Sequence, residues 1–352
     1  MNNNGLVLKV CIGFVLSILS HLTAAQDCIT QSSSFSFILK AKQQGLFRFE
    51  NEHTHQSFNY QALLPFQRYL DYAYDHINKA NPRANVPCPV ITDTYKQLVK
   101  QGVRTTNPNI ADIIAPFELK HPTSNKVALL IHGLTDSPFT YHDLARIYYE
   151  QGYSVRTLLL PGHGSAASAL QNVDVKQWQK AVNYGVNRAL TDFDEVILGG
   201  YSTGAALVID YLTKQTPSPK IKALMLYSPG TEPHNKNGWL AKWIDAIPFV
   251  DWIDKDADID FAKYESFPFH AAAASYDAMQ LVSIDQLSKR SALKLPIFSV
   301  LSDIDTTIDT RASLKLLSAL HKGNSPKYKT RDTLVFYGNT DTLPAGFAAN
   351  YK

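Results

Sequence analysis

The sequence has little of what marks several large classes of protein. Its formal net charge is only +3, and no run of Lys and Arg is interleaved with aromatic residues, which argues against nucleic acid as a partner. Hydrophobic residues make up 45% and charged residues 18% of the chain, a balance that excludes a disordered protein and a polytopic membrane protein. No internal repeat or low-complexity segment is evident. The chain can therefore bury a sizeable core, and its 18 Tyr, 17 Phe and 4 Trp are expected mainly to fill it.

The apolar run near the N-terminus is too short to span a membrane. Val10–Leu19 is about ten residues, roughly half of a bilayer-spanning helix. Lys9 gives this run a positive start, and Thr23–Ala25 offers the small residues of a cleavage site before Gln26. We therefore expect residues 1–25 to be a signal peptide and the protein to be exported, either periplasmic or secreted. A membrane anchor formed by an uncleaved N-terminal segment is the alternative.

Cysteine is scarce. Cys11 lies in the expected signal peptide, which leaves Cys28 and Cys88 in the mature chain. Two cysteines that enter an oxidising compartment often pair. A bridge between them would close a loop of about 60 residues and stabilise the fold by on the order of 4 kcal/mol. Two unrelated thiols are the alternative.

Clustered metal ligands are also lacking. His53 and His55 stand close together, but no further ligand lies nearby at metal-site spacing, so a surface loop is expected. Neither a metal nor an organic cofactor is implied. These histidines belong to an N-terminal extension, residues 26–114, that carries no catalytic signature. The spacing of its apolar residues predicts helices over Pro65–Ala80 and Thr92–Gln101.

From residue 115 onward, strands alternate with helices. Strands are expected at 117–119, 127–131, 155–160, 196–198, 223–227, 296–301 and 333–337, and helices at 139–152, 175–190, 205–213 and 312–321. This alternation predicts an α/β fold whose mostly parallel sheet is covered by helices on both faces. An aromatic-rich, mostly helical insertion predicts a cap over the carboxyl ends of the strands, where open α/β sheets bind ligands. The predicted parts are the core at 115–230, the helical cap at 231–293 and the core again at 294–352.

The strongest chemical signal is a G-x-S-x-G motif. Gly200-Tyr201-Ser202-Thr203-Gly204 stands between a buried strand and an apolar helix. Glycines are needed there because the strand-to-helix turn is so sharp that side chains would collide. The turn lifts the serine hydroxyl toward a pocket. The motif therefore predicts that Ser202 is the nucleophile of a serine hydrolase.

A second signal directly follows the expected strand at 127–131. There, His132-Gly133-Leu134 can supply a backbone N–H to an oxyanion. We expect the amides of Leu134 and Thr203 to form the oxyanion hole, each contributing about 3 kcal/mol of transition-state stabilisation. His132 itself is expected to be structural rather than the catalytic base.

Aspartates follow the strand after the cap. A carboxylate at this carboxyl end can accept a hydrogen bond from a catalytic base and hold its tautomer. We choose Asp305 for this role over Asp303 and Asp309. Asp309 precedes a helix and fits a capping residue best.

With Pro161-Gly162-His163-Gly164, these motifs resemble the α/β-hydrolases. The chain is particularly similar to the monoacylglycerol lipase and carboxylesterase branch, often labelled serine aminopeptidase S33-like or Hydrolase_4-type. The similarity covers about residues 115–337, excluding most of the cap. It implies an α/β-hydrolase fold, with Ser202 as nucleophile, Asp305 as triad acid and His163 in a structural role. It also implies ester substrates more than peptides.

One departure from the family pattern concerns the base. The resemblance implies a histidine in the loop after the last strand, which is expected to end near Tyr337, yet no histidine follows before Lys352. His321 is the only histidine after Asp305, and it is expected at a helix C-terminus, where a cation is favourable. We interpret the sequence as a C-terminally incomplete copy of an enzyme, with the base lost or lying beyond Lys352.

The leading hypothesis is an exported hydrolase of carboxylic esters, lipid-like or with short acyl chains, that acts through an acyl-serine intermediate. The aromatic cap suggests a hydrophobic acyl pocket. Contact of Trp239–Ile253 with a lipid interface is possible in principle, but packing in the core is the expected use of that stretch. The alternatives are a non-catalytic binding protein that lacks the base and an exported serine peptidase. The oligomeric state is left open.

Overall fold

The computed structural model describes residues 27–52, 57–290, 292–320, 332–339, 341 and 343. The expected signal peptide, His53, His55 and His321 lie outside these residues, so the predictions for them remain predictions. In the part of the chain that is described, no helix is long and apolar enough to cross a membrane.

Within the described residues, seven strands form one sheet in the order β1-β3-β2-β4-β5-β8-β9. Their bounds are β1 (Glu118–Leu119), β2 (Lys126–Ile131), β3 (Ser154–Leu158), β4 (Glu195–Tyr201), β5 (Ile221–Tyr227), β8 (Ile297–Ser302) and β9 (Thr333–Tyr337). Only β1 is antiparallel to its neighbour; the other pairs are parallel. Each predicted strand is present to within a few residues. The carboxyl ends of six parallel strands therefore share one edge of the sheet.

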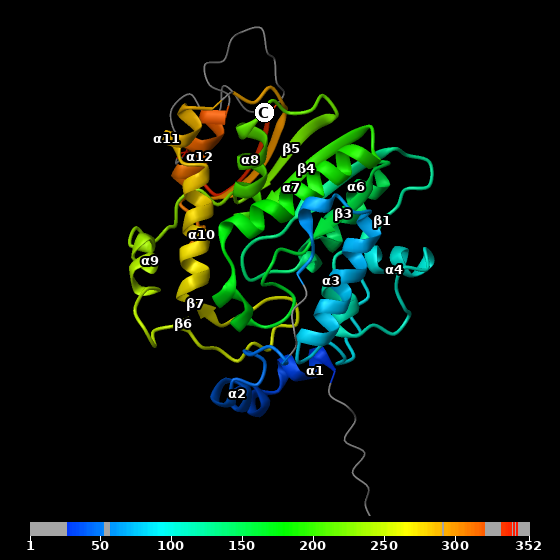
Figure 1. Cartoon of the computed structure of the whole chain (residues 1–352), viewed down its shortest axis with the longest axis vertical. Helices are drawn as coiled ribbons and strands as arrows, with labels where there is room; N and C mark the ends of the chain where they lie inside the picture. The colour runs from blue at the N-terminus through cyan, green and yellow to red at the C-terminus, as the bar shows by residue number, and fades with distance from the viewer. Residues whose placement is uncertain are drawn as a thin grey trace, which may run out of the picture.

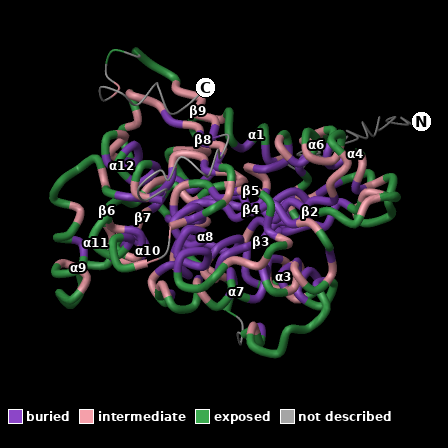
Figure 2. The backbone as a smooth tube through the Cα atoms, turned by 90° about the horizontal axis from the view of Figure 1, so that it is seen from above, coloured by how far each residue is buried: buried purple, intermediate pink, exposed green. Residues whose placement is uncertain are grey.

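Helices cover both faces of the sheet, as predicted (Figure 1). They include α6 (His142–Glu150), α7 (Val175–Asp192), α8 (Thr203–Lys214) and α12 (Thr310–Leu320). Alternate residues of a strand point to opposite faces. Accordingly, Leu129 of β2 packs in one cluster with α7, α8 and α12, while its neighbour Leu130 packs in another with α6. Figure 2 shows this buried centre running through β2 to β5 and α8.

The N-terminal extension is helical and packs against the core. Its helices are α1 (Cys28–Ser33), α2 (Phe35–Gln44), α3 (Phe66–Ala80), α4 (Asp93–Lys100) and α5 (Ile110–Ile114), with the 3-10 turn η1 (Tyr60–Ala62). The two helices predicted from apolar spacing, α3 and α4, are confirmed. Thr92 caps α4 by accepting a hydrogen bond from the Tyr95 N–H at 3.1 Å.

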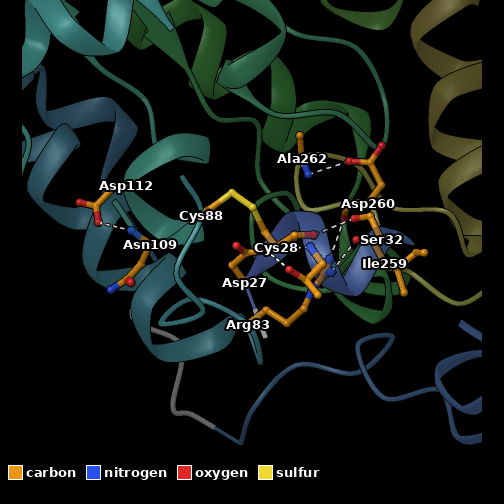
Figure 3. The surroundings of a disulfide bond; sticks show 11 residues. Asp27, Cys28, Ser32, Arg83, Cys88, Asn109, Asp112, Ile259, Asp260 and Ala262 are labelled. Carbon is orange, nitrogen blue, oxygen red and sulfur yellow. Dashed lines mark hydrogen bonds between the residues drawn. A yellow bond between two sulfur atoms is a disulfide. The ribbon is translucent and has the colours of Figure 1, made fainter. Parts of the chain in front are cut away.

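Cys28 and Cys88 form a disulfide, as predicted, with their Cα atoms 5.0 Å apart. Both side chains are fully buried. Figure 3 shows the bond between α1 and the segment before α5, with Arg83, Ile259 and Asp260 nearby. The disulfide therefore ties the first residues of the N-terminal extension to a segment later in the same extension.

The segment predicted as a mostly helical cap is less helical than expected. It contains the turn η4 (Gly238–Leu240), α9 (Ala241–Ile244), β6 (Trp252–Asp254), β7 (Phe267–Pro268), α10 (Phe269–Leu281) and α11 (Ile284–Ser288). β6 and β7 pair in a small antiparallel sheet. Between them, the carboxylates of Asp256, Asp258 and Asp260 accept hydrogen bonds from nearby backbone N–H groups. Such local bonds compete with helix formation, which explains the irregular stretch.

The expectation that Trp239–Ile253 packs in the core is wrong. Trp243 is 71% exposed and Phe249 is 98% exposed, and five more large apolar residues of this stretch are exposed: Trp239, Leu240, Ile247, Val250 and Ile253. Helical spacing cannot order this stretch, because α9 is only four residues long. We call these seven residues the apolar cap patch.

Candidate active site

Ser202 lies at a sharp junction between β4 and α8. Its backbone has φ 49° and ψ −117°, a conformation that L-residues rarely adopt. The flanking glycines allow the turn: a Cβ on Gly200 would lie 2.5 Å from the Ala205 backbone, and one on Gly204 would lie 2.1 Å from the carbonyl oxygen of Ile131. The strand–turn–helix geometry expected from the motif is therefore present, and it holds Ser202 in a strained position at the sheet edge.

The two candidate oxyanion donors flank this serine. Leu134 lies in the loop of residues 132–136, which follows β2, and Thr203 is the first residue of α8. Gly133 brings this loop against the elbow, since a Cβ on it would lie 3.1 Å from the Ser202 Cβ. Within the described residues, neither the Leu134 nor the Thr203 N–H is recorded donating to another group. Both amides are therefore available to a ligand oxygen.

A cavity of about 640 Å³ opens at Ser202 and extends under the cap. Its core side includes Leu134, Tyr201 and Thr307. Its cap side is largely apolar and includes Leu240, Ala241, Ile244, Ile253, Phe267, Phe269, Ala272 and Met279. A few polar groups join them, among them Lys263 and Glu265. Apolar walls with a few polar groups are typical of small-molecule sites.

The structure gives the three candidate aspartates different environments. Asp305 Oδ1 accepts from the N–H groups of Thr307 (2.8 Å) and Ile308 (2.9 Å), and its Oδ2 accepts from the Ser228 hydroxyl. Asp303 instead accepts from the Asn339 N–H at 2.8 Å, after β9.

Asp309 caps α12 by accepting from the Ala312 N–H at 3.0 Å, as predicted. Asp305 alone of the three is bonded to residues that line the cavity, since its carboxylate accepts from the Thr307 and Ile308 N–H groups.

Ser228 is a residue that the sequence analysis missed. It directly follows β5, the strand between β4 and β8 in the sheet, and so stands between the elbow and the Asp305 loop. Its hydroxyl fixes the Asp305 carboxylate. A polar residue at the carboxyl end of an expected strand was the available signal.

His132 and His163 are both engaged in holding loops. His132 Nδ1 donates to the Gly133 carbonyl at 2.7 Å, and its Nε2 accepts from the Leu160 N–H at 3.0 Å. His163 Nε2 accepts from the Thr135 N–H at 3.1 Å. Burial lowers the pKa of His132 well below its usual value and lowers that of His163 to about 4. Both rings are therefore neutral at neutral pH, consistent with the structural roles expected for them.

The described part of the chain contains no cluster of three or more His, Cys, Asp or Glu side chains that could hold a metal ion.

Comparison with known proteins places the chain in a family. The family model described as "Serine aminopeptidase, S33" (Hydrolase_4) matches residues 122–334, more than half of the chain. The chain belongs to this family. A thermostable monoacylglycerol lipase from Bacillus sp. (strain H-257) is 29% identical over 89 residues. This match spans 25% of our chain and only 35% of that lipase.

Two solved structures share the fold of this S33-family chain. A structure of the metagenome-derived lipolytic enzymes LipS and LipT matches with a TM-score of 0.52 and 17% identity, covering 64% of our chain and 88% of that one. A soluble variant of the monoglyceride lipase from Saccharomyces cerevisiae, in complex with a substrate analog, matches with a TM-score of 0.50 and 15% identity, covering 63% and 82%. The sheet order and these likenesses establish the α/β-hydrolase fold.

The base that the S33-family resemblance implies is not among the described groups around Ser202. No hydrogen bond to the Ser202 hydroxyl is recorded within the described residues, and the buried histidines of the site, His132 and His163, bond to backbone groups instead. His321 lies outside the described residues. The sequence contains no histidine between Tyr337 and Lys352.

Proposed function

We propose that this protein is a serine hydrolase that cleaves carboxylic esters with an apolar acyl group. Ser202 would attack the ester carbonyl and form an acyl-serine, which water then hydrolyses. The amides of Leu134 and Thr203 would hold the negatively charged oxygen of the tetrahedral intermediate. Asp305, held by three donors, would orient the base.

The observation that carries this proposal is the position of Ser202 at one end of a mostly apolar cavity. The strained elbow presents the hydroxyl to the cavity, and the cap residues supply apolar surface for a hydrocarbon chain. A carboxylic ester with an acyl chain meets both features: its carbonyl fits at the amides and its chain fits under the cap. The names of the two lipase relatives agree with this substrate class.

The nucleophile can be tested by covalent labelling. A fluorophosphonate should label Ser202, and Ser202→Ala should abolish labelling. In a protein that also carries the base, Ser202→Ala should reduce hydrolysis of p-nitrophenyl esters by several orders of magnitude. Ser275→Ala is the matched control, because Ser275 also lines the cavity but its hydroxyl pairs with that of Thr203 at 3.2 Å. Labelling that survives in Ser202→Ala would show that the reactive serine lies elsewhere.

The presence of a base sets the expected rate. A serine hydroxyl is a poor nucleophile without a base to take its proton, so if no histidine serves Ser202, the 352-residue chain should hydrolyse esters slowly. His321→Ala should leave that slow rate unchanged. If the chain binds long-chain esters but neither reacts with the fluorophosphonate nor hydrolyses esters, the alternative of a non-catalytic binding protein is supported instead.

We further propose that the apolar cap patch contacts a lipid surface. Leu240 and Ile253 belong to the patch and also line the cavity, so a lipid surface at the patch would lie at the cavity wall. Exposed Trp and Phe are typical of interfacial contacts. The segment 239–253 carries Lys242, Asp245 and Asp251, so it lacks the excess of positive charge that anionic lipids would select.

Vesicle binding tests this contact. The chain should co-sediment with zwitterionic phosphatidylcholine vesicles, and Phe249→Ala combined with Trp243→Ala should reduce binding at least tenfold. Phe35→Ala is the matched control, because Phe35 is 73% exposed but lies on α2, outside the patch. Equal losses in the two variants would argue against a specific surface, and loss of a dimer in place of vesicle binding would assign the patch to self-association.

We also propose that the protein is exported, because its buried disulfide needs an oxidising compartment to form. N-terminal sequencing of the mature protein should begin near Gln26. An intact Met1 in the mature form would contradict export with cleavage.

A further inference from the structure

The loop of residues 132–136, which carries Leu134, is held at one residue from two directions. Thr135 donates its N–H to His163 Nε2 at 3.1 Å and accepts, at its carbonyl, the N–H of Tyr264 at 2.8 Å. Its backbone has φ 63°, a left-handed conformation that costs free energy in a β-branched residue. The Leu134 N–H shares a peptide plane with the Gly133 carbonyl, which His132 holds at 2.7 Å, while His163 and Tyr264 hold the next residue of the same loop.

Tyr264 of the cap contacts two loops of the core, the one that carries His163 and the one that carries Thr135. Its ring stacks on His163 with centroids 6.0 Å apart and planes at 12°. Its hydroxyl donates to the Gly162 carbonyl at 3.2 Å and accepts from the Ser165 N–H at 2.9 Å. The same residue thus fixes the loop that carries His163 and the loop that carries Thr135.

Tyr264 belongs to an irregular cap loop, residues 256–266, that two arginines of the N-terminal extension hold from outside. Arg83 donates to the carbonyls of Ile259 and Asp260, both at 2.7 Å. Arg48 donates to the Asp256 carbonyl at 2.8 Å and to the Ser266 hydroxyl at 3.0 Å. The arginines therefore hold both ends and the middle of this loop by bonds that bridge more than 170 positions of sequence.

Arg83 carries a buried positive charge, which the fold tolerates only if the surrounding groups compensate for it. Arg83 is only 6% exposed, and burial lowers its pKa to about 10. A buried guanidinium is tolerated only when its donors are satisfied and its charge is balanced. Asp258, Asp260 and Glu265 supply the opposite charge.

The extension is itself anchored. The disulfide joins Cys28 to Cys88, in the segment that follows Arg83, and Figure 3 shows Arg83 reaching from beside this bridge toward Ile259 and Asp260. Asn81 adds a direct bond to the Gly164 carbonyl at 2.9 Å. The part of the extension that holds the cap loop is therefore itself fixed, by the disulfide and by the hydrogen bond from Asn81 to the core.

We propose that the N-terminal extension positions the oxyanion loop, with Arg83 and Tyr264 as positioning residues that act through the cap loop on Thr135. The path runs from the disulfide-anchored extension through Arg83 to residues 259–260, then along the cap loop to Tyr264 and Thr135. Its catalytic consequence rests on the proposed function, but the mechanical coupling does not. Neither arginine lines the cavity, so the effect of the arginines on chemistry is indirect, whereas Tyr264 and Thr135 lie in the cavity wall.

Hydrogen exchange of the full chain tests the coupling without any need for activity. Arg83→Met keeps most of the side-chain stem and removes its donors. We expect the Thr135 and Tyr264 amides to exchange at least tenfold faster in this variant, because their acceptors lose a fixed position. Amides of β4 and α7 should be unchanged, which separates this effect from global destabilisation.

Arg104→Met is the matched control. Arg104 also lies in the extension and donates to three backbone carbonyls, those of Asp112 and Pro116 at 3.0 Å and that of Val103 at 3.2 Å, but within the described residues no hydrogen bond joins it to the cap loop. Exchange at Thr135 should match that of the parent in this variant. Equal acceleration by Arg104→Met, or none by Arg83→Met, would overturn the proposal.

A milder variant covers the case in which Arg83→Met does not fold. Tyr264→Phe removes only the hydroxyl bonds to Gly162 and Ser165 and keeps the backbone bond to Thr135. Thr135 should again exchange faster, because His163 is held less firmly. Unchanged exchange at Thr135 in a folded Tyr264→Phe protein would contradict the assignment of Tyr264.

Ester hydrolysis supplies the catalytic readout. Arg83→Met and Tyr264→Phe should lower kcat about tenfold with KM unchanged, and Arg83→Lys should restore part of the loss. If the parent chain shows no hydrolysis and no labelling at Ser202, the proposed function fails while the exchange result still decides the coupling. If hydrolysis is present and exchange at Thr135 does not respond, the coupling fails alone.

Discussion

Adding one methyl group at Gly204 tests whether the elbow depends on a close approach of two backbones. A Cβ on Gly204 would lie 2.1 Å from the Ile131 carbonyl oxygen and 2.4 Å from that of His132. Real Cβ contacts essentially never fall below 3.0 Å, so β2 and α8 must separate by about 0.9 Å. Overpacking costs about 1–3 kcal/mol, and more where no side chain can yield. Alanine in a helix gains back about 1 kcal/mol over glycine. We expect a net loss of at least about 2 kcal/mol.

Gly185→Ala provides the matched control, because Gly185 lies in the interior of α7 and gains the same helical propensity. Its added Cβ would meet the Leu158 Cδ1 at 2.5 Å, the end of a side chain that can rotate away. Urea unfolding should therefore place Gly185→Ala within about 1 kcal/mol of the parent. Fluorophosphonate labelling of Ser202 should fall only in Gly204→Ala, because the displaced carbonyls adjoin the oxyanion loop. Equal unfolding free energies in the two variants would refute the reasoning.

Three further predictions concern the disulfide, Ser228 and His163. Replacing Cys28 and Cys88 with Ser should lower the unfolding free energy by about 2–5 kcal/mol in urea titrations, and an unchanged midpoint would argue against the bridge. In a protein that carries the base, Ser228→Ala should lower kcat for p-nitrophenyl esters about tenfold with KM unchanged, because Asp305 keeps its two backbone donors but loses its third; an unaltered kcat there would exclude Ser228 from the mechanism. Burial lowers the pKa of His163 to about 4, so the unfolded chain binds the proton first and stability should fall by a few kcal/mol as the pH drops from 6.5 to 4. His163→Gln should make that dependence less steep but not remove it, because burial also lowers the pKa values of His132 and His142; urea unfolding at several pH values measures the change.

The fold of the core could be predicted because its signals are local. Apolar periodicity gave strands and helices whose ends lie within a few residues of those observed, and Thr92 and Asp309 begin helices as their residue types suggest. The cap could not be predicted in the same way. Its order depends on aspartates that bond to backbone groups and on arginines far away in sequence, such as Arg48 with Ser266, 218 positions apart. Helices and strands are predicted from short stretches of sequence, and a contact between residues so far apart leaves no signal in any of them.

The residues of the candidate site also differ in how far the sequence could predict their positions. Ser202, Leu134 and Thr203 could be placed because each follows directly from a motif and its strand. Ser228 could not, since its role depends on β5 lying between β4 and β8 in the sheet. The exposure of Phe249 was also unpredictable, because whether an aromatic residue packs or faces solvent depends on what the rest of the fold leaves to cover it.

The distribution of backbone strain bears on the choice between an enzyme and a binding protein. Three non-glycine residues with left-handed backbones, Thr135, Ser202 and Ser228, follow β2, β4 and β5, which are adjacent in the sheet. Each such conformation costs on the order of 1–3 kcal/mol and persists only where its surroundings hold it in place. A hydrophobic binding pocket needs none of the three, because apolar contact does not depend on the direction of one hydroxyl or one amide. The proposed nucleophile Ser202, the proposed oxyanion loop that carries Thr135, and Ser228, which anchors the proposed acid Asp305, would each depend on one of these conformations. The strain therefore supports the proposed ester hydrolysis over binding alone.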